Sequence, residues 1–266
     1  MSFAGLLSPA YGFGYLGHRL VGEVAQQHLC EDAQTALKEL NDPYSFVTAG
    51  SWADKVRYRP EWRHTRTWHY ININGDTFDS ETGRKASGDV LWAIEHYGER
   101  LRDKEVSDDE RREAMLFYVH FVADLHQPLH SGYSSDLGGN KVKVSVGGRK
   151  TNLHSVWDTG LLQYNGLDEN GDPAPEEPIQ DYIQRLLALS AGNTDVWQDS
   201  TPQDWLLESM ALRPDVYAFD ETGAIVLGDQ YLSESKEIID VRLAQAGVRL
   251  AGELNAIWCP APVSAN

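Results

Sequence analysis

Apolar residues recur at helical spacing along most of the chain, which is the pattern of a largely helical protein. Between His18 and Leu40 the apolar positions fall mostly three or four residues apart, at Leu20, Val21, Val24, Ala25 and Leu29. Further helices are predicted over Asn152–Tyr164, Ile179–Ala191, Pro202–Leu212 and Ser233–Ile257. The pattern therefore predicts a mostly α fold.

The segment that begins at Ser107 has the strongest helix signals. Ser107 is a typical N-cap, and Glu110 stands three residues later, in the second position of a capping box. The apolar run Met115–Val119 then directs the helix inward, and Pro128 ends it. We expect this helix to enter the core.

One segment has a persuasive strand pattern. Lys141–Val146 alternates polar and apolar residues, and Gly147 and Gly148 follow, so we predict a small β-hairpin. Residues 165–178 are rich in Gly, Pro, Asp and Glu, which indicates an exposed connection or a domain boundary. We prefer one domain over residues 13–266, because the later helices are needed to bury the earlier ones.

The composition is that of a soluble globular protein, with 41% hydrophobic and 24% charged residues in 266. No apolar run is long enough to span a bilayer, so we expect no stable membrane association. We also expect a monomer. The net charge of −17 argues against a protein that holds nucleic acid through a broadly basic surface. Bound divalent cations would weaken this objection, because they can invert the potential of a cleft.

Two features bear on the compartment. Cys30 and Cys259 stand near opposite ends of the chain, either as buried free thiols or as one disulfide formed in an oxidising compartment. Residues 1–12 are interpreted as a leader remnant or a disordered N-terminus, since Ala10-Tyr11-Gly12 resembles a signal-peptidase site just before Phe13. A leader would indicate a secreted or periplasmic protein.

Histidine and aspartate recur in a pattern that suits a metal centre. His120 and Asp124 are four residues apart on a predicted helix, and so are His154 and Asp158, so each pair shares a helix face. His130 follows Pro128 and leaves the direction of the helix. Further nitrogen and oxygen donors stand upstream at His18, Asp54 and His69. Zn²⁺ accepts such donors, although the alternative for each pair is a hydrogen bond without a metal.

Six segments then indicate a family. FGYLGH, SWAD, WHY, HFVADLHQPLH, GGNK and NLHSVWD occur in the same order and with similar spacing in the S1/P1 zinc nucleases of fungi, plants and bacteria. The chain resembles this family from residue 13 to about residue 257. The resemblance implies a single-domain, mostly helical fold, which the bacterial zinc phospholipases C share.

The resemblance also implies three zinc ions. The first is expected at Asp54, His69, His120 and Asp124, and the second at His130, His154 and Asp158. Asp124 is expected to bridge to a third, held by His18 and by the backbone nitrogen and carbonyl oxygen of Phe13, where the family usually has Trp. An internal amide is a very poor ligand, so the third zinc requires a free amine and therefore cleavage before Phe13.

Four residues match substrate-binding positions of the family. Arg57 matches an arginine that contacts phosphate, Tyr70 a ring that stacks on a base, and Asn72 a polar base contact. Leu137 is expected to form the other wall of the base site. Without the resemblance, Arg57 would be interpreted as a surface ion pair and Tyr70 as core packing. The expected catalytic residues are Asp54, Arg57 and Asp124.

The resulting hypothesis is hydrolysis of single-stranded DNA, RNA and 3′-nucleotides by zinc-activated water that attacks phosphorus. A single stacking ring tolerates any base but needs an unpaired one, which favours single strands. The alternatives are a phospholipase C with the same metals and a zinc-binding protein without activity. His64 and His126 receive no role.

Overall fold

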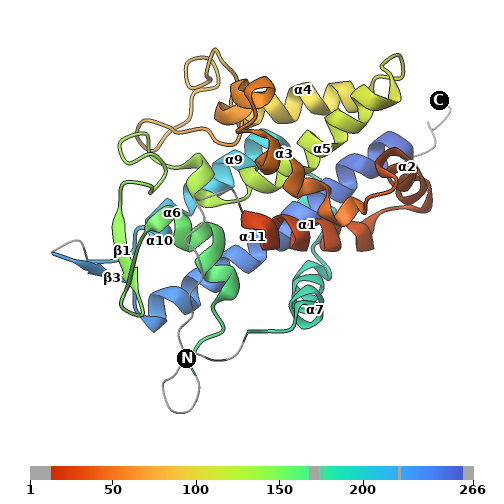
Figure 1. The fold of residues 1–266 in the computed structure, drawn as a ribbon. Coiled ribbons are helices and arrows are strands. Elements are labelled where there is room, and N and C mark those ends of the chain that lie inside the picture. The colour runs from red at the N-terminus through yellow and green to blue at the C-terminus, as the bar shows by residue number, and fades with distance from the viewer. Residues whose placement is uncertain (1–12, 168–173, 175, 221–222, 260–266) are drawn as a thin grey trace.

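The computed structural model describes residues 13–167, 174, 176–220 and 223–259, so the predicted leader remnant, residues 1–12, lies outside the described residues. Helices make up most of the described chain, which confirms the mostly α fold (Figure 1). None of these helices is long and apolar enough to cross a bilayer. The longer elements, in order, are α1 (Gly14–His28), α2 (Glu31–Asn41), α4 (Val90–Arg102), α5 (Asp108–Leu125), α7 (Ile179–Ser190), α9 (Pro202–Ala211) and α11 (Asp229–Trp258). Short helical segments are η1 (Phe46–Ser51), α3 (Trp52–Val56), η2 (Pro60–Thr67), η3 (Pro128–Ser131), α6 (Leu153–Ser155), η4 (Val156–Gly160), η5 (Leu161–Gln163), α8 (Thr194–Gln198) and α10 (Arg213–Val216).

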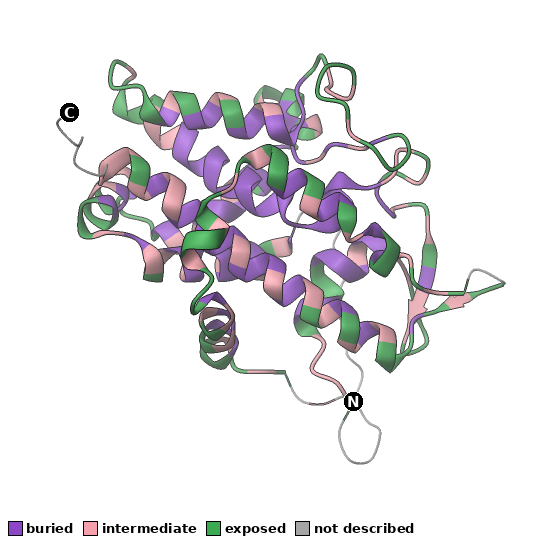
Figure 2. Ribbon diagram, turned by 180° about the vertical axis from the view of Figure 1, so that it is seen from behind, coloured by how far each residue is buried: buried purple, intermediate pink, exposed green. Residues whose placement is uncertain are grey.

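Helix α5 runs through the middle of the molecule and has the predicted capping box. The Ser107 hydroxyl accepts a hydrogen bond from the Glu110 amide at 3.3 Å, and the Glu110 carboxylate accepts one from the Ser107 amide at 3.0 Å. Every residue from Ala114 to Leu125 is buried, since α1, α4 and α11 all pack against this helix. Figure 2 shows the buried positions gathered in the middle of the helical assembly. Polar side chains on the last turns of α5 are therefore shielded from water.

The prediction of one helical stretch from His18 to Leu40 was wrong at a single point. The chain is extended at Leu29 and Cys30, which separates α1 from α2. The cause is non-local. The side-chain NH₂ of Asn255 donates to the His28 carbonyl, and the side-chain oxygen of Asn255 accepts from the Cys30 backbone amide, both at 2.9 Å. Cys30 also forms a disulfide with Cys259, which resolves the two alternatives for the cysteines.

Helix α4 was missed, although the sequence carries its signals. Asp89 is the N-cap, and its carboxylate accepts from the Trp92 amide at 3.0 Å. The buried positions of α4 are Val90, Leu91, Ala93, Ile94, Tyr97, Gly98 and Leu101, mostly at helical spacing. This helix forms one wall of the core against α5.

The predicted hairpin is confirmed as β1 (Lys143–Val146) and β2 (Arg149–Asn152), antiparallel and joined through Gly147 and Gly148, both with positive φ. A third strand, β3 (Ile225–Val226), was not predicted, and it pairs in parallel with β1.

The segment Asn152–Tyr164, predicted as one helix, is helical but irregular, since α6, η4 and η5 follow one another. The helices predicted over Ile179–Ala191, Pro202–Leu212 and Ser233–Ile257 are confirmed as α7, α9 and α11, of which α11 begins four residues earlier.

Candidate metal centre

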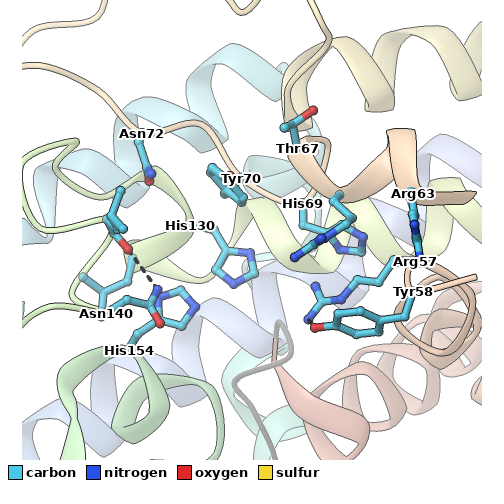
Figure 3. Close-up of a pocket in the computed structure, with 13 residues that line it drawn as sticks. Arg57, Tyr58, Arg63, Thr67, His69, Tyr70, Asn72, His130, Asn140 and His154 are labelled. Carbon is cyan, nitrogen blue, oxygen red and sulfur yellow. Dashed lines mark hydrogen bonds between the residues drawn. The ribbon is translucent and has the colours of Figure 1, made fainter. Parts of the chain in front are cut away.

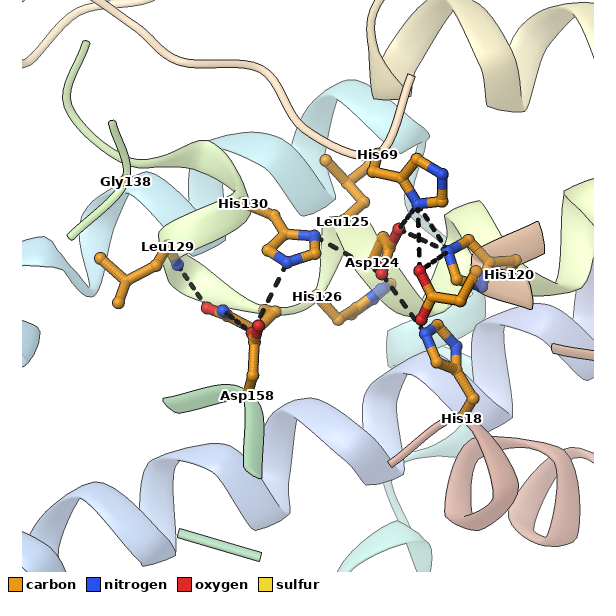
Figure 4. Close-up of polar contacts among 12 residues, drawn as sticks. His18, His69, His120, Asp124, Leu125, His126, Leu129, His130, Gly138 and Asp158 are labelled. Atoms are coloured by element: carbon orange, nitrogen blue, oxygen red, sulfur yellow. Dashed lines mark hydrogen bonds and ion pairs between the residues drawn. The ribbon is translucent and has the colours of Figure 1, made fainter. Parts of the chain in front are cut away.

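One carboxylate, that of Asp124, lies among four imidazoles (Figure 4). Its Oδ2 atom is 2.8 Å from His120 Nε2 and 3.0 Å from His69 Nδ1. Its Oδ1 atom is 3.5 Å from His18 Nε2 and 3.5 Å from His130 Nδ1. The two oxygens therefore face different rings, and bound metal ions on either side would each find one carboxylate oxygen.

His69 and His130 come from distant segments that the backbone holds side by side. The Ile71 amide donates to the His130 carbonyl at 2.8 Å, and the Ile73 amide donates to the Gly132 carbonyl at 3.0 Å. The turn η3 reverses the chain after α5 and makes this pairing possible. His69 is thereby brought to Asp124, near the end of α5.

The second HxxxD pair extends the site on the other side of His130. His154 Nε2 is 3.1 Å from Asp158 Oδ2, one helical turn away, and His130 Nε2 is 3.6 Å from Asp158 Oδ1. The His130 and His154 rings stack with their centroids 5.3 Å apart. The Gln127 side-chain amide donates a hydrogen bond to Asp158 Oδ1 and so helps to orient that carboxylate.

The structure thus brings all eight predicted side-chain ligands into one continuous centre. Three groups have ligand atoms within 4.8 Å of one another: His18, His120 and Asp124; Asp54, His69 and His120; His130, His154 and Asp158. The third group has the residues predicted for the second zinc, and the second group has those predicted for the first zinc except Asp124, which falls in the group of His18. His120 lies near His18 as well, since their rings stack with centroids 4.1 Å apart.

Several buried polar atoms of this centre have no hydrogen-bond partner among the residues that the structure describes. They are both ring nitrogens of His18, His69 Nε2, Asp124 Oδ1 and His130 Nδ1. Buried polar atoms of proteins are nearly always paired, so a concentration of unpaired ones needs a cause. Imidazole and carboxylate donors are the ligands of divalent metal ions, and the residues present therefore fit metal ions.

Backbone carbonyls fix the tautomers of two of the histidines. His120 Nδ1–H donates to the Gly50 carbonyl at 2.5 Å, and His154 Nδ1–H donates to the Gly138 carbonyl at 2.6 Å. Each bond leaves the Nε2 lone pair facing the carboxylates. Such outer contacts orient the imidazoles of metal sites and raise their basicity.

Burial and mutual contact determine the charges of the centre. Burial lowers the pKa of His18 to about 3 and that of His69 to about 4, so both rings are neutral at neutral pH. Burial opposes ionisation of Asp124, but the imidazoles of His120 and His130 outweigh it and hold its pKa well below the usual range. Burial opposes protonation of His120 and His154 as well, but Asp124 and Asp158 outweigh it and raise the pKa of these two rings. The centre therefore offers neutral imidazoles at His18 and His69 and an ionised carboxylate at Asp124, and metal binding would displace protons from the other rings.

Phe13 lies at the start of α1, one turn before His18. Its side chain is fully buried, and its carbonyl accepts from the Gly17 amide at 3.0 Å. A carbonyl oxygen has two lone pairs, so this bond leaves one available. The ligand role predicted for the backbone of Phe13 depends further on residues 1–12.

The centre opens into a cleft of about 530 Å³ (Figure 3). Arg57, Tyr70, Asn72 and Leu137, the predicted substrate contacts, all line it. Arg57 is buried and 3.1 Å from Asp54, so its ion pair lies inside the site and not on the open surface. Tyr70 is half-buried at the cleft wall, which leaves part of its ring available to a ligand.

Leu137 occupies a backbone conformation that side chains seldom adopt, with φ at 58°. Gly138 and Gly139 continue the turn at positive φ, and a Cβ on Gly138 would stand 2.4 Å from the Leu129 carbonyl oxygen. This turn brings the Gly138 carbonyl to His154 while the Leu137 side chain stays 49% exposed beside the cleft. A strained leucine at this point fits a role in the site.

Substitution of Leu137 separates its backbone cost from its side-chain contribution. The free energy of unfolding, measured in urea, should be about 1 kcal/mol higher for Leu137→Gly than for Leu137→Ala, since glycine adopts positive φ without strain. Both variants should raise the KM for a nucleotide substrate, because both remove the Leu137 side chain from the lining of the cleft. An alanine variant at least as stable as the glycine variant would contradict the strain argument.

Sequence reasoning missed other lining residues: Tyr58, Arg63, Arg66 and Asn140. It also missed Lys85, whose ammonium lies 4.1 Å from the centroid of the Tyr70 ring. Asn140 stands in the segment GGNK, which would have drawn attention to it. The contact of Lys85 joins two loops and leaves no trace in the local sequence.

His64 and His126, which received no role, stand outside the three metal groups. His126 is buried, its Nδ1–H donates to the Val122 carbonyl at 2.8 Å, and its Nε2 accepts from Arg249 at 3.0 Å. It therefore ties α5 to α11. The ring of His64 packs near Trp62 and Trp68 at the surface.

Comparison with known proteins agrees with the segments that the sequence shares. The profile of the S1/P1 Nuclease family matches residues 13–258. Endonuclease 2 of Arabidopsis thaliana is 32% identical over 93% of this chain and 91% of its own length, and Endonuclease 3 of that plant is 30% identical over 95% and 91%. Nuclease P1 of Penicillium citrinum is 29% identical over 92% of this chain and 97% of its own length.

Proposed function

The chain belongs to the S1/P1 nuclease family, and on that premise we propose that it uses zinc to cleave single-stranded DNA and RNA and to remove the phosphate from 3′-nucleotides. Nuclease activity, and hence hydrolysis of nucleic acid, follows from the family. The zinc and the substrate range rest on one observation. Three groups of His and Asp meet around Asp124 at the floor of a cleft lined by a guanidinium, an aromatic ring and an amide.

The donor set suits zinc better than harder cations, because imidazole nitrogens outnumber carboxylates. Zinc held there would act as a Lewis acid towards a phosphate oxygen and would make water a stronger nucleophile at neutral pH. Asp54, Asp124 and Asp158 supply the negative charge that balances such cations in a buried site.

The side chains that line the cleft around this centre then have distinct roles in binding the substrate. Arg57 presents a planar, charged fork beside Asp54, which suits contact with a phosphate. Tyr70 offers a ring face to an unpaired base, and the Asn72 amide can both donate to and accept from base edges. Figure 3 shows Arg57 and Asn72 on opposite sides of the cleft, with Tyr70 and His130 between them. We expect a nucleotide to lie across the cleft with its phosphate towards Arg57 and its base towards Tyr70 and Asn72.

Metal analysis combined with hydrolysis assays tests the proposal. The purified protein should contain zinc and should cleave single-stranded DNA, RNA and 3′-AMP faster than duplex DNA. Exhaustive chelation should abolish the activity, and added Zn²⁺ should restore it. Turnover of phosphatidylcholine in place of nucleotides would favour a phospholipase C, and zinc without any turnover would favour a non-enzymatic protein.

We propose further that three zinc ions bind and that the third depends on a free amine at Phe13. The support is the position of His18 beside Asp124, where neither of its buried ring nitrogens has a hydrogen-bond partner in the described part of the chain. The disulfide between Cys30 and Cys259 supports a secreted or periplasmic location, where such bonds persist.

N-terminal sequencing of the native protein with its zinc stoichiometry tests this second proposal. A chain that starts at Phe13 should hold one more zinc than a chain that retains residues 1–12. Equal zinc content in the two forms would contradict the role of the amine. Recovery of the native protein from the cytoplasmic fraction would contradict the location.

A further inference from the structure

Arg213, the first residue of α10, is a buried arginine with no part in the proposed chemistry. Its Nε donates to the Ser131 carbonyl at 2.9 Å, its Nη1 to the Gly75 carbonyl at 2.8 Å, and its Nη2 to the Gly132 carbonyl at 3.3 Å. A guanidinium remains charged in proteins, and burial of a charged group is costly. A charge kept in this position therefore needs a cause.

The three carbonyls belong to the two segments that carry the predicted base contacts. Residues 70–76 include Tyr70 and Asn72, and residues 130–139 include Leu137. One of the carbonyls lies in the first segment and two lie in the second. Hydrogen bonds from a charged donor are stronger than those between neutral groups. The guanidinium therefore joins the two segments by a strong contact.

The ring of Tyr133 covers the same guanidinium and joins the segments again. The Arg213 guanidinium lies 4.5 Å from the ring centroid, and the Tyr133 hydroxyl donates to Asp76 Oδ1 at 2.7 Å. The backbone pairing also continues here, since the Ser134 amide donates to the Ile73 carbonyl at 3.0 Å. The relative position of the two segments therefore depends on Arg213 and on the contacts next to it.

The residue that follows α10 holds the turn that carries Leu137. The Tyr217 hydroxyl donates to Asp136 Oδ2 at 2.6 Å, and Asp136 Oδ1 accepts from the Gly139 amide at 2.9 Å. These bonds close the turn across Leu137, which has positive φ. Tyr217 stands four residues after Arg213, so one short helix contacts both walls of the base site.

Contacts with three longer helices fix the position of α10. The Tyr231 hydroxyl of α11 donates to the Val216 carbonyl at 2.6 Å and accepts from Trp157 Nε1 at 2.9 Å. The Ser209 hydroxyl of α9, which leads into α10, donates to the Leu125 carbonyl at the end of α5 at 2.7 Å. The support under the base site therefore takes its position from α5, α9 and α11.

We propose that Arg213 is a positioning residue for the base site. With Tyr217 it holds Tyr70 and Asn72 at a fixed separation from Leu137. This inference rests on the proposed function and deepens it, since it makes recognition of the base depend on α10. Among the described residues, Arg213 does not line the cleft, so it acts through the two segments and not by contact with substrate.

The metal centre has separate supports, which allows base binding to be tested apart from the chemistry. The His130 amide donates to the Gln127 carbonyl at 2.9 Å, and the His130 carbonyl accepts from the Ile71 amide at 2.8 Å. Neither bond involves α10. Loss of Arg213 should therefore affect binding of the base more than zinc content or the rate of hydrolysis.

Arg213→Met tests the inference on 3′-AMP and on the 3′-phosphate of an abasic deoxyribose, which has no base. The KM for 3′-AMP should rise at least about tenfold, since hydrogen bonds from a charged group are lost, and kcat should stay within about threefold. On the abasic substrate kcat/KM should change by less than about threefold, and zinc content should not change. An equal fall in kcat/KM on both substrates indicates general damage to the site and would overturn the inference.

Tyr217→Phe tests the same inference in a variant that loses one hydrogen bond and keeps its ring. The KM for 3′-AMP should rise about threefold, the usual effect of one such bond. The matched control is Tyr182→Phe, because the Tyr182 hydroxyl also donates to a buried carboxylate, Asp240 Oδ1, at 2.5 Å and away from the cleft. Equal KM values for the variant and the control would count against the inference as strongly as the first result.

Hydrogen exchange measured by mass spectrometry separates the positioning role from activity. Peptides over residues 130–139 should exchange faster in both variants than in the wild type, and peptides over residues 70–76 should do so in Arg213→Met. Peptides from α7 should not change. If the wild type hydrolyses no nucleotide, the proposed function fails, and this comparison still decides the positioning role. Unchanged exchange in the two segments would refute it.

Discussion

Asp124→Asn should lower kcat/KM on single-stranded DNA by at least about 10³-fold, because the proposed metal centre would lose its central carboxylate and with it several kcal/mol of transition-state stabilisation. The Asp124 carboxylate contacts four imidazoles, and asparagine keeps its shape but not its charge. The variant should also bind fewer zinc ions than the wild type, as elemental analysis of the dialysed protein will show.

A second buried carboxylate provides the matched control for this variant. Asp240 accepts from the Tyr182 hydroxyl at 2.5 Å and pairs with Lys236 at 2.8 Å, and neither it nor these partners line the cleft. Asp240→Asn should lower thermal stability and leave zinc content and kcat/KM near those of the wild type. A folded Asp124→Asn protein with full zinc content and full activity would remove Asp124 from the centre of the mechanism.

Loss of the disulfide should have the largest effect on stability. Cys30 and Cys259 are separated by 229 residues, and a cross-link over so long a loop restricts the unfolded chain strongly. Cys30→Ser/Cys259→Ser is therefore expected to lower the free energy of unfolding by about 2–5 kcal/mol. Urea denaturation of the two proteins under oxidising conditions will measure the difference.

Reduction provides the control for this second experiment. A phosphine reductant, which does not chelate zinc as a dithiol does, should destabilise the wild type towards the level of the double variant and should leave the variant unchanged. Activity at low temperature should survive in both, since neither cysteine lies in the cleft or in a metal group. Equal unfolding midpoints for the wild type and the variant would show that the Asn255 contacts alone hold the ends of α1 and α11 together.

Prediction from the sequence succeeded where the signals are local. The capping box at Ser107 and the helix that follows it depend on contacts within a few residues, and both were predictable. The same holds for the hairpin at Gly147 and Gly148. Helix α4 was equally predictable from the Asp89 N-cap and its apolar spacing, but it was missed.

Non-local contacts account for the remaining errors. The extended residues Leu29 and Cys30 interrupt an acceptable helical pattern because Asn255, 225 residues after Cys30, hydrogen-bonds to the backbone on both sides. The short strand β3 forms by pairing with the edge of β1, which lies far from it in the sequence. Neither feature changes the hydrophobic periodicity of its own segment.

The sequence by itself determined the helical class and the pairing of His120 with Asp124 and of His154 with Asp158, because residues four apart on a helix necessarily share a face. Only the tertiary structure decided that His18, His69 and His130, from three separate segments, meet the same carboxylate. It alone also placed Arg63 and Arg66 beside the centre. The physical reason is that local spacing fixes where a side chain lies on its own element, whereas burial and long-range backbone hydrogen bonds determine which elements meet.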